Sequence, residues 1–202
     1  TIPVGRGLGS SAALSIAIAR AKKLTNIREI ADKCEKFIHG NPSGIDVNQV
    51  LSDTPLLFSK KDGAIPLDFN LDSYLLIIDT GVIGITKETL KHIKQNFENY
   101  KSYIDELGEI TEKVIEPLKK KAIEIVGEYM YKAHYLLQKL GVSHESNDDV
   151  VNICKNNGAL GAKLTGGGAG GCCIALSKTK ENAEKIQNEL AKKGYKSWIV
   201  TV

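Results

Sequence analysis

The feature that most constrains the fold is a glycine-rich segment that leads directly into a run of small apolar residues. Three glycines and two serines are packed into seven positions: Gly5, Gly7, Gly9, Ser10 and Ser11. Residues 12–20, which follow at once, are alanine, leucine, isoleucine and serine with a single arginine at the end. Because this stretch is small and apolar on nearly every side, it predicts a buried helix entered through a tight loop.

Such a loop is suited to binding an anion. Glycines let the backbone approach a ligand closely, and a helix start offers unpaired N–H groups and the positive end of the helix dipole. The hydroxyls of Ser10 and Ser11 could hold a phosphate oxygen or a metal ion. The segment is not a Walker A loop, because it lacks the GxxxxGK[ST] pattern and has no lysine at the helix start. The alternative interpretation is a tight turn before a core helix.

A second glycine cluster occupies residues 166–171. It satisfies the pattern GxGxxG, but that dinucleotide-binding fingerprint must lead into a helix, and here it leads into the strand-like run from Cys172 to Leu176. We therefore reject the dinucleotide fold. A hairpin tip is the simpler alternative, but six small residues in succession exceed what a turn needs. The cluster favours close approach to a ligand or to another loop.

A third segment, residues 35–46, combines groups that can bind a metal ion and move a proton. Each has a simpler explanation: Glu35 could be a solvated helix charge, His39 a cation at a helix C-terminus, and Asp46 part of a capping box with Ser43. A functional pair of carboxylates becomes attractive because the chain also has a candidate phosphate loop. Phosphoryl transfer needs a Mg²⁺ ligand and a group that orients or deprotonates the acceptor hydroxyl, and carboxylates suit both roles.

Composition excludes several classes of protein. The 202 residues are 42% hydrophobic with a net charge of +3, as in ordinary soluble globular chains, and no apolar stretch approaches the ~20 residues of a membrane span. The densest basic run, residues 119–121, is interpreted as a solvated face at a helix start, so no nucleic-acid partner is expected. The four cysteines form no CxxC pair, and His92, His134 and His144 have no partner at zinc spacing. These observations predict a reducing, cytoplasmic location without a disulfide framework or a zinc site.

The order of elements predicts an α+β protein. Helices are expected over residues 12–20, 27–38, 42–51, 86–100, 103–116, 117–140 and 180–193, with another that Ser146 or Asn147 caps and that ends at 157. Strands are expected over residues 56–59, 64–69, 74–78, 161–164, 172–176 and 198–202, the strand at 74–78 being buried on both faces. Strands separated by helices, with a hairpin turn at Asp62-Gly63, favour α+β rather than a parallel βαβ arrangement.

Three motifs together resemble the GHMP kinases, the superfamily of galactokinase, homoserine kinase, mevalonate kinase and phosphomevalonate kinase. The pattern Pro3-x-x-x-Gly7-Leu8-Gly9-Ser10-Ser11-Ala12-Ala13 resembles the second motif of that family. The run KLTGGGAGGC from Lys163 to Cys172 resembles its third motif. The run IHGNPSGID from Ile38 to Asp46 narrows the resemblance to the mevalonate kinase branch, and the resemblance covers essentially the whole chain.

The resemblance implies a two-lobed α+β fold with ATP and mevalonate bound between the lobes. Residues 1–71 would form part of an ATP-binding N-terminal lobe like ribosomal protein S5, and residues 72–202 a ferredoxin-like C-terminal lobe. The ATP phosphates would be held by the second motif and supported by the third, that is by Gly5, Arg6, Gly7, Leu8, Gly9, Ser10, Ser11, Gly166, Gly167 and Gly168. Ser11 and Glu35 would be the Mg²⁺ ligands, and Asp46 the catalytic carboxylate facing the acceptor hydroxyl.

The function implied by the resemblance is ATP-dependent phosphorylation of mevalonate to phosphomevalonate, in isoprenoid precursor synthesis. The alternatives are a sister kinase acting on phosphomevalonate, homoserine or a sugar, and a nucleotide-binding module without catalysis. The family's first motif, which contributes a catalytic lysine, has no counterpart in these residues, so we expect the 202 residues alone not to be an active kinase. Thr80 and Thr86 are candidates for contacts to the acceptor. We expect no membrane partner, and a homodimer is left open.

Overall fold

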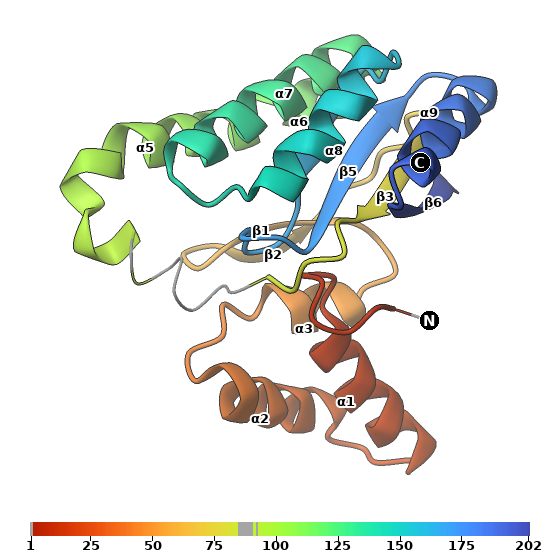
Figure 1. Ribbon diagram of the computed structural model, residues 1–202. Coiled ribbons are helices and arrows are strands. Elements are labelled where there is room, and N and C mark those ends of the chain that lie inside the picture. The colour runs from red at the N-terminus through yellow and green to blue at the C-terminus, as the bar shows by residue number, and fades with distance from the viewer. Residues whose placement is uncertain (1, 85–90, 92) are drawn as a thin grey trace. The chain divides into compact units, whose positions relative to one another are not determined.

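The computed structural model describes residues 2–84, 91 and 93–202. Contacts within the chain divide it into two compact units. Unit 1 comprises Thr1–Val4 and Leu8–Asp68, and unit 2 comprises Gly5–Gly7 and Phe69–Val202. The ribbon in Figure 1 follows the chain through both units, and the glycine-rich segment near the N-terminus contributes to each of them.

Unit 1 consists of helices followed by a hairpin. Its elements are α1 (Ser10–Ala21), α2 (Ile27–His39), α3 (Ile45–Val50), β1 (Leu56–Ser59) and β2 (Gly63–Pro66). The strands pair antiparallel with Ser59 opposite Gly63, so the hairpin turn expected at Asp62-Gly63 is confirmed, although β2 ends at Pro66 rather than at residue 69. The core of the unit is small and joins Ala12 and Ile16 of α1 to α2 and α3.

Helix α1 is not buried on every side. Ala12, Ile16 and Ala19 are almost completely buried, whereas Leu14 is 62% exposed and Ile18 is 53% exposed. The buried positions recur every three or four residues, so a single stripe of the helix packs against the core of unit 1. The expectation of a helix buried all round is therefore wrong for this unit, because an apolar composition does not determine which faces are covered.

Unit 2 contains an antiparallel four-stranded sheet in the order β4–β5–β3–β6. The strands are β3 (Tyr74–Asp79), β4 (Gly161–Leu164), β5 (Cys172–Ser177) and β6 (Lys196–Thr201). Helices connect β3 to β4 and β5 to β6, and each connection passes over an intervening strand, which is the split βαβ topology of ferredoxin-like folds. The α+β class is thereby confirmed, and β3 has a paired strand on each side.

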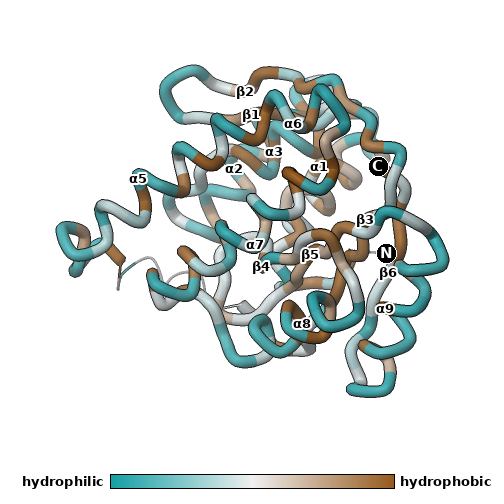
Figure 2. Tube along the Cα trace, turned by 90° about the horizontal axis from the view of Figure 1, so that it is seen from above, coloured by the Kyte–Doolittle hydropathy of each residue, from teal (hydrophilic) through white to brown (hydrophobic). Residues whose placement is uncertain are grey.

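Helices α8 and α9 cover one face of this sheet. The helices of unit 2 are α5 (Phe97–Lys113), α6 (Ile115–Lys119), α7 (Ile123–Lys139), α8 (Glu145–Asn156) and α9 (Lys180–Lys192). Leu76 and Ile78 of β3 are completely buried and pack with Val150 of α8 and Ile186 of α9. Figure 2 shows β3 and β5 as mainly hydrophobic and α9 as mainly hydrophilic, so α9 buries only its inner stripe. Among the described helices, none is both long and apolar enough to cross a membrane.

The opposite face of the sheet is covered less completely. Leu176 of β5 packs there with Ile123, Val126 and Met130 of α7. On the same face of β3, however, Leu75 and Ile77 are only half-buried. The expectation that β3 is buried on both faces therefore holds for one face only.

In the helical part of unit 2, the helices begin and end at other residues than the sequence predicts. One predicted helix boundary is absent, and one boundary that was not predicted is present. Helix α5 runs without interruption through residues 101–102, where two helices were expected to meet, and its N-cap is Asn96. The single helix expected after Pro117 is divided into α6 and α7, because Lys121 between them adopts a left-handed φ of 56°. Thr86, the first residue of the helix expected over residues 86–100, lies outside the described residues.

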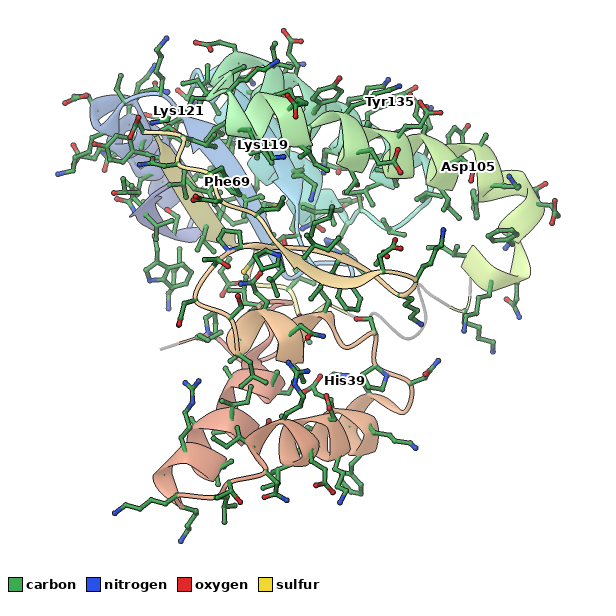
Figure 3. The ribbon with its side chains drawn as sticks, turned by 180° about the vertical axis from the view of Figure 1, so that it is seen from behind. His39, Phe69, Asp105, Lys119, Lys121 and Tyr135 are labelled. Carbon is green, nitrogen blue, oxygen red and sulfur yellow. The ribbon has the colours of Figure 1, made fainter. Side chains whose placement is uncertain are left out.

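The lysine run 119–121 lies at the end of α6 rather than at a helix start. Its members are exposed, as Figure 3 shows for Lys119 and Lys121, so the interpretation as a solvated surface is confirmed. Lys121 forms an ion pair with Asp72, and Lys120 lies 3.5 Å from Glu116. Paired, solvated lysines of this kind contribute little to stability.

Helix α7 crosses β4 at a pair of glycines. A Cβ atom at Gly127 would overlap the carbonyl oxygen of Leu160, and a Cβ atom at Gly161 would overlap the backbone of Gly127. The helix and the strand are therefore in direct backbone contact, and only hydrogen fits at either position.

This crossing predicts a large stability difference between two glycine-to-alanine changes. We expect Gly127→Ala to lower the free energy of unfolding by about 1–3 kcal/mol, because the added methyl group forces α7 away from β4. Gly108→Ala is the matched control: it lies on α5, where a Cβ atom would meet nothing within 4 Å, and alanine favours the helix by up to about 1 kcal/mol. Urea unfolding followed by circular dichroism measures both. Equal shifts for the two variants would contradict the close crossing.

Candidate functional site

In unit 1, helix α1 begins directly after the glycine-rich loop, and the backbone N–H groups of its first turn are not capped by a side chain. Gly9 is the N-cap and has a left-handed φ of 63°, which favours glycine. Its carbonyl accepts a hydrogen bond from the N–H of Ala13 at 3.0 Å, so the helix begins with Ser10 and Ser11. The N–H groups of the first turn have no partner within the helix, and no side chain caps them. A tight turn is present, and it leaves the donors that an anion site requires without a capping side chain.

Ser11, Glu35 and His39 lie together next to this helix start. The hydroxyl of Ser11 is 3.3 Å from Nε2 of His39, the last residue of α2, which Figure 3 labels. The same nitrogen is 3.6 Å from Oε2 of Glu35. Glu35 is only 3% exposed, and its Oε1 is buried without a hydrogen-bond partner. The interpretation of Glu35 as a solvated helix charge is therefore wrong, since a buried and unsatisfied carboxylate oxygen is costly.

Asp46 lies against the same helix start. A Cβ atom at Gly9 would be 3.4 Å from the Cγ atom of Asp46, so this carboxyl group borders the glycine loop. The N-cap of α3 is Gly44, without a side-chain cap, and the hydroxyl of Ser43 accepts a hydrogen bond from the N–H of Ile45 instead. The capping-box interpretation of Asp46 is therefore wrong.

The surroundings of Asp46 favour its protonated form. Although the residue as a whole is exposed, partial burial of the carboxyl group and then the negative charge of Glu35 raise the pKa of Asp46 above its ordinary value. The nearby His39 offsets part of this effect. A carboxyl group with a raised pKa is better suited to accept a proton than an ordinary aspartate.

These groups fit a hard divalent cation such as Mg²⁺. The unpartnered Oε1 of Glu35 and the hydroxyl of Ser11 are oxygen ligands, and a cation would also offset the two effects that raise the pKa of Asp46, burial first and the charge of Glu35 second. Among the described residues, no group of three or more His, Cys, Asp and Glu side chains converges on one point. The protein would therefore supply only part of the coordination shell, as is usual for Mg²⁺ bound together with substrate phosphates.

In unit 2, the second glycine cluster packs against the first part of the glycine-rich loop. A Cβ atom at Gly166 would lie 2.9 Å from the carbonyl oxygen of Gly7, and one at Gly171 would lie 3.0 Å from that of Arg6. The N–H of Cys172 donates to the carbonyl of Arg6 at 3.1 Å. The cluster joins the paired antiparallel strands β4 and β5, as a hairpin tip does, and it also approaches another loop closely.

Arg6 itself is fixed to the end of β3. Its Nε atom is 3.0 Å from Oδ1 of Asp79 and donates to Oδ2 at 3.2 Å, and both side chains are less than one-fifth exposed. The N–H of Gly81 donates to the same carboxylate at 2.8 Å. The sequence reasoning missed Asp79, for which the only signal was a charged residue at the end of an apolar strand. Its contact joins segments 73 positions apart.

Of the candidates for acceptor contact, Thr80 is 6% exposed, and its hydroxyl donates to the carbonyl of Gly171 at 2.6 Å. Thr86 lies outside the described residues, as does His92.

His134, for which the sequence analysis proposed no role, is buried. Its Nδ1 accepts a hydrogen bond from the N–H of Leu164 at 3.3 Å, its Nε2 is 3.2 Å from Asp148, and burial lowers its pKa.

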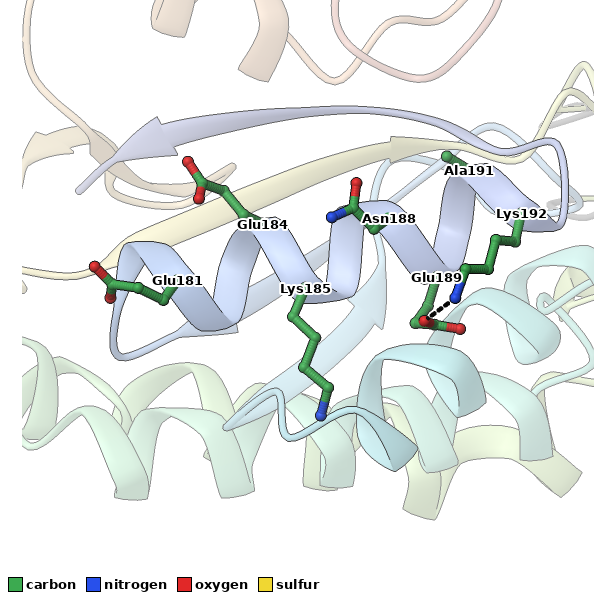
Figure 4. A pocket seen from close by; sticks show the side chains of 7 residues that line it. All are labelled: Glu181, Glu184, Lys185, Asn188, Glu189, Ala191 and Lys192. Atoms are coloured by element: carbon green, nitrogen blue, oxygen red, sulfur yellow. Dashed lines mark hydrogen bonds and ion pairs between the residues drawn. The ribbon is translucent and has the colours of Figure 1, made fainter.

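A hollow of about 820 Å³ lies on the outer face of α9. Figure 4 shows the side chains that line it: Glu181, Glu184, Lys185, Asn188, Glu189, Ala191 and Lys192. Its lining is almost wholly charged or polar and shares no residue with the glycine loops or with the carboxylates of unit 1. We therefore assign the hollow no part in the candidate site.

Comparison with known proteins agrees with this architecture. The family descriptions "GHMP kinases N terminal domain" and "GHMP kinases C terminal" match residues 1–52 and 114–196. The mevalonate kinase of Thermococcus sibiricus is 34% identical over 198 residues, which cover 90% of this chain and 59% of that relative. The chain thus spans about three-fifths of the length of the curated relatives that it matches.

Solved structures give the same result. The structure of L. major mevalonate kinase in complex with R-mevalonate superimposes with a TM-score of 0.88 at 27% identity, covering 100% of this chain and 68% of that one. Mevalonate kinase from methicillin-resistant Staphylococcus aureus MRSA252 gives a TM-score of 0.76 at 30% identity, with the same two coverages. The two glycine motifs, the sheet order of unit 2 and these matches lead to one conclusion: the chain belongs to the GHMP kinases.

Proposed function

We propose that the protein carrying this chain transfers the γ-phosphoryl group of ATP to mevalonate, giving phosphomevalonate and ADP for isoprenoid precursor synthesis. The observation that carries the proposal is the grouping of Ser11, the buried Glu35 and Asp46 around the start of α1. The choice of mevalonate rests on the relatives, which include a mevalonate kinase solved with R-mevalonate.

The glycine loops would bind and position ATP. We infer that the residues from Gly5 to Ser11 receive the phosphates on backbone N–H groups and on the hydroxyls of Ser10 and Ser11. The Arg6–Asp79 pair fixes the first part of this loop. Gly166, Gly167 and Gly168 belong to the second glycine cluster, which packs against this first part of the loop. Phosphoryl transfer depends mainly on such positioning and on charge stabilisation.

Asp46 would act on the acceptor. Its carboxylate takes the proton of the mevalonate hydroxyl as that oxygen forms a bond to the γ-phosphorus atom, and the bond from this phosphorus to the leaving oxygen of ADP breaks. The raised pKa of Asp46 favours acceptance of the proton. Ser11 and Glu35 would hold Mg²⁺, which when bound offsets the negative charge of the phosphate oxygens.

We also propose a cytoplasmic location. The four cysteines are free. Burial raises the pKa of Cys172 to about 11 and the pKa values of Cys154 and Cys173 to about 12, so these thiols stay protonated and unreactive at neutral pH. Free, unreactive thiols of this kind are typical of a reducing compartment.

A coupled ADP-release assay on the complete protein tests the proposed activity, with mevalonate, phosphomevalonate, homoserine and galactose as separate acceptors. We expect turnover with mevalonate alone, and turnover lower by about a hundredfold or more in an identically purified Asp46→Asn variant, which controls for contaminating kinases. Turnover with another acceptor but not with mevalonate would identify a sister kinase instead. Nucleotide binding without turnover of any acceptor would instead identify the protein as a nucleotide-binding module without catalytic activity.

A further inference from the structure

We propose that Asn147 is a positioning residue for nucleotide binding, because it clamps the second glycine cluster in the conformation that supports Gly5–Gly7. All the contacts that carry this inference lie within unit 2. The inference rests on the proposed function, since it assigns Gly5–Gly7 to the ATP phosphates.

The side-chain amide of Asn147 is fully used. The residue is completely buried in the first turn of α8. Its Oδ1 accepts hydrogen bonds from the N–H of Gly170 and from the N–H of His144, each at 3.1 Å. Its Nδ2 donates to the carbonyl of Gly170 at 3.0 Å and lies 3.4 Å from the sulfur of Cys173. Both backbone groups of Gly170 are therefore bound by one side chain, which must donate and accept at the same time. Neither an aliphatic nor an ionised side chain can do both.

The backbone around Gly170 needs such support. The φ angles of Gly168, Ala169, Gly170 and Gly171 are all positive, so the cluster contains neither a helix nor a strand that could pair its own groups. The two neighbours of Gly170 form hydrogen bonds to segments outside the cluster. The N–H of Ala169 donates to the carbonyl of Val142, and the N–H of Gly171 donates to the carbonyl of Val82, both at 2.8 Å. Gly170 lies between these two attachments, and the amide of Asn147 fixes it there.

The clamp is close to the loop that it would serve. The next two residues, Gly171 and Cys172, lie beside the carbonyl oxygen of Arg6. A Cβ atom at Gly171 would be 3.0 Å from this oxygen, and the N–H of Cys172 donates to it at 3.1 Å. Gly171 is also bonded to Val82 and Thr80, so release of Gly170 removes one of the attachments that hold Gly171 and Cys172 against the backbone of Arg6. We therefore expect loss of Asn147 to weaken nucleotide binding more than it affects binding of the acceptor.

A purely structural role is the competing explanation, because Asn147 also completes the capping box of α8 through the N–H of His144. The sequence predicted Asn147 or Ser146 as the cap itself, but the N-cap is His144. A role confined to capping would lower thermal stability and leave the affinity of the folded protein for nucleotide unchanged.

The test measures the Kd for Mg·ADP by calorimetry, and the KM for mevalonate, in the complete protein. We expect Asn147→Ala to weaken Mg·ADP binding at least tenfold, equivalent to about 1.4 kcal/mol, with the mevalonate KM within twofold of wild type. Asn182→Ala is the matched control: its amide donates to Gly158 at 2.9 Å and to Ser177 at 3.1 Å, away from the glycine loops, and should leave Kd within twofold.

A second variant and a second measurement keep the test decisive. Asn147→Asp retains the shape and both acceptor bonds, including the cap, and removes the donations to the carbonyl of Gly170 and to the sulfur of Cys173, so it should still fold and bind Mg·ADP more weakly. Hydrogen exchange of the peptide 168–171 should be at least tenfold faster in both Asn147 variants, whether or not the protein is a kinase. An unchanged Kd and unchanged exchange, with melting lowered as in Asn182→Ala, would overturn the inference. If wild type binds no nucleotide, the proposed function fails, and exchange alone decides the clamp.

Discussion

Asp46→Asn in the complete enzyme is expected to lower turnover by about 10²–10⁴-fold, the usual contribution of a general base, with little change in ATP affinity. The physical reason is that the amide keeps the shape of the carboxyl group beside Gly9 but cannot take the proton of the acceptor hydroxyl. Steady-state kinetics with saturating ATP give the turnover, and calorimetry gives the affinity. Asp53→Asn, an exposed aspartate that follows α3, is the control and should keep full turnover.

The stability of the same variant separates catalysis from a local structural role. Because folding raises the pKa of Asp46, protonation of this group stabilises the folded state. That contribution is present below the unfolded-state pKa and is lost as the pH rises through the folded-state pKa. At neutral pH, Asp46→Asn should therefore be as stable as wild type or slightly more stable, within about 0.5 kcal/mol because the residue is exposed. Normal turnover with a lowered melting temperature would contradict the catalytic assignment.

Glu35→Gln is expected to raise the Mg²⁺ concentration for half-maximal rate at least tenfold, which corresponds to about 1.4 kcal/mol of metal binding. A hard cation prefers a carboxylate oxygen to an amide oxygen, and Oε1 of Glu35 is buried without another partner. Ser11→Ala removes only a neutral hydroxyl and should have a smaller effect. Titration of the rate with Mg²⁺ at fixed ATP measures both.

Thermal melting gives an independent check on Glu35. Without metal, Glu35→Gln should be at least as stable as wild type, because burying a neutral amide costs less than burying a carboxylate of which one oxygen has no hydrogen-bond partner. Mg·ADP should stabilise wild type more than the variant, since a ligand that binds the folded state raises stability according to its affinity. Glu29→Gln is the matched control, on the same helix but exposed and paired with Lys33 at 2.6 Å. Identical Mg²⁺ responses in Glu35→Gln and Glu29→Gln would remove Glu35 from the metal site.

The helices, strands and turns that could be predicted are those determined by residues within or next to the segment itself. The turn at Asp62-Gly63 gives the β1–β2 hairpin, and Gly194 follows α9 with the positive φ of 86° expected of a glycine after a helix. The apolar run at β3 predicts a strand from its own composition. By contrast, the separation of α6 from α7 depends on the left-handed backbone at Lys121, for which the sequence carries no glycine signal.

The candidate site could be predicted as a set of residues but not as an arrangement. Glu35 lies one position from the apolar stripe of α2, and its burial follows from packing within unit 1 that no pattern in the helix encodes. The partners of Asn147 and Arg6 are 23 and 73 positions away, so their roles arise only from the fold. The roles assigned to Ser11, Glu35 and Asp46 in metal binding and proton transfer remain predictions.

The register of β3 also determines when unit 2 can be completed during synthesis. Tyr74 pairs with Ser177 on one side and with Thr201 on the other, so both neighbours of this strand leave the ribosome about a hundred residues after it. Until then, the apolar edge of β3 has nothing to pair with, while α5 to α8 can already form from local contacts. The nascent chain therefore carries an unpaired apolar strand while about a hundred further residues are made, and conditions that slow elongation should increase its demand for chaperones.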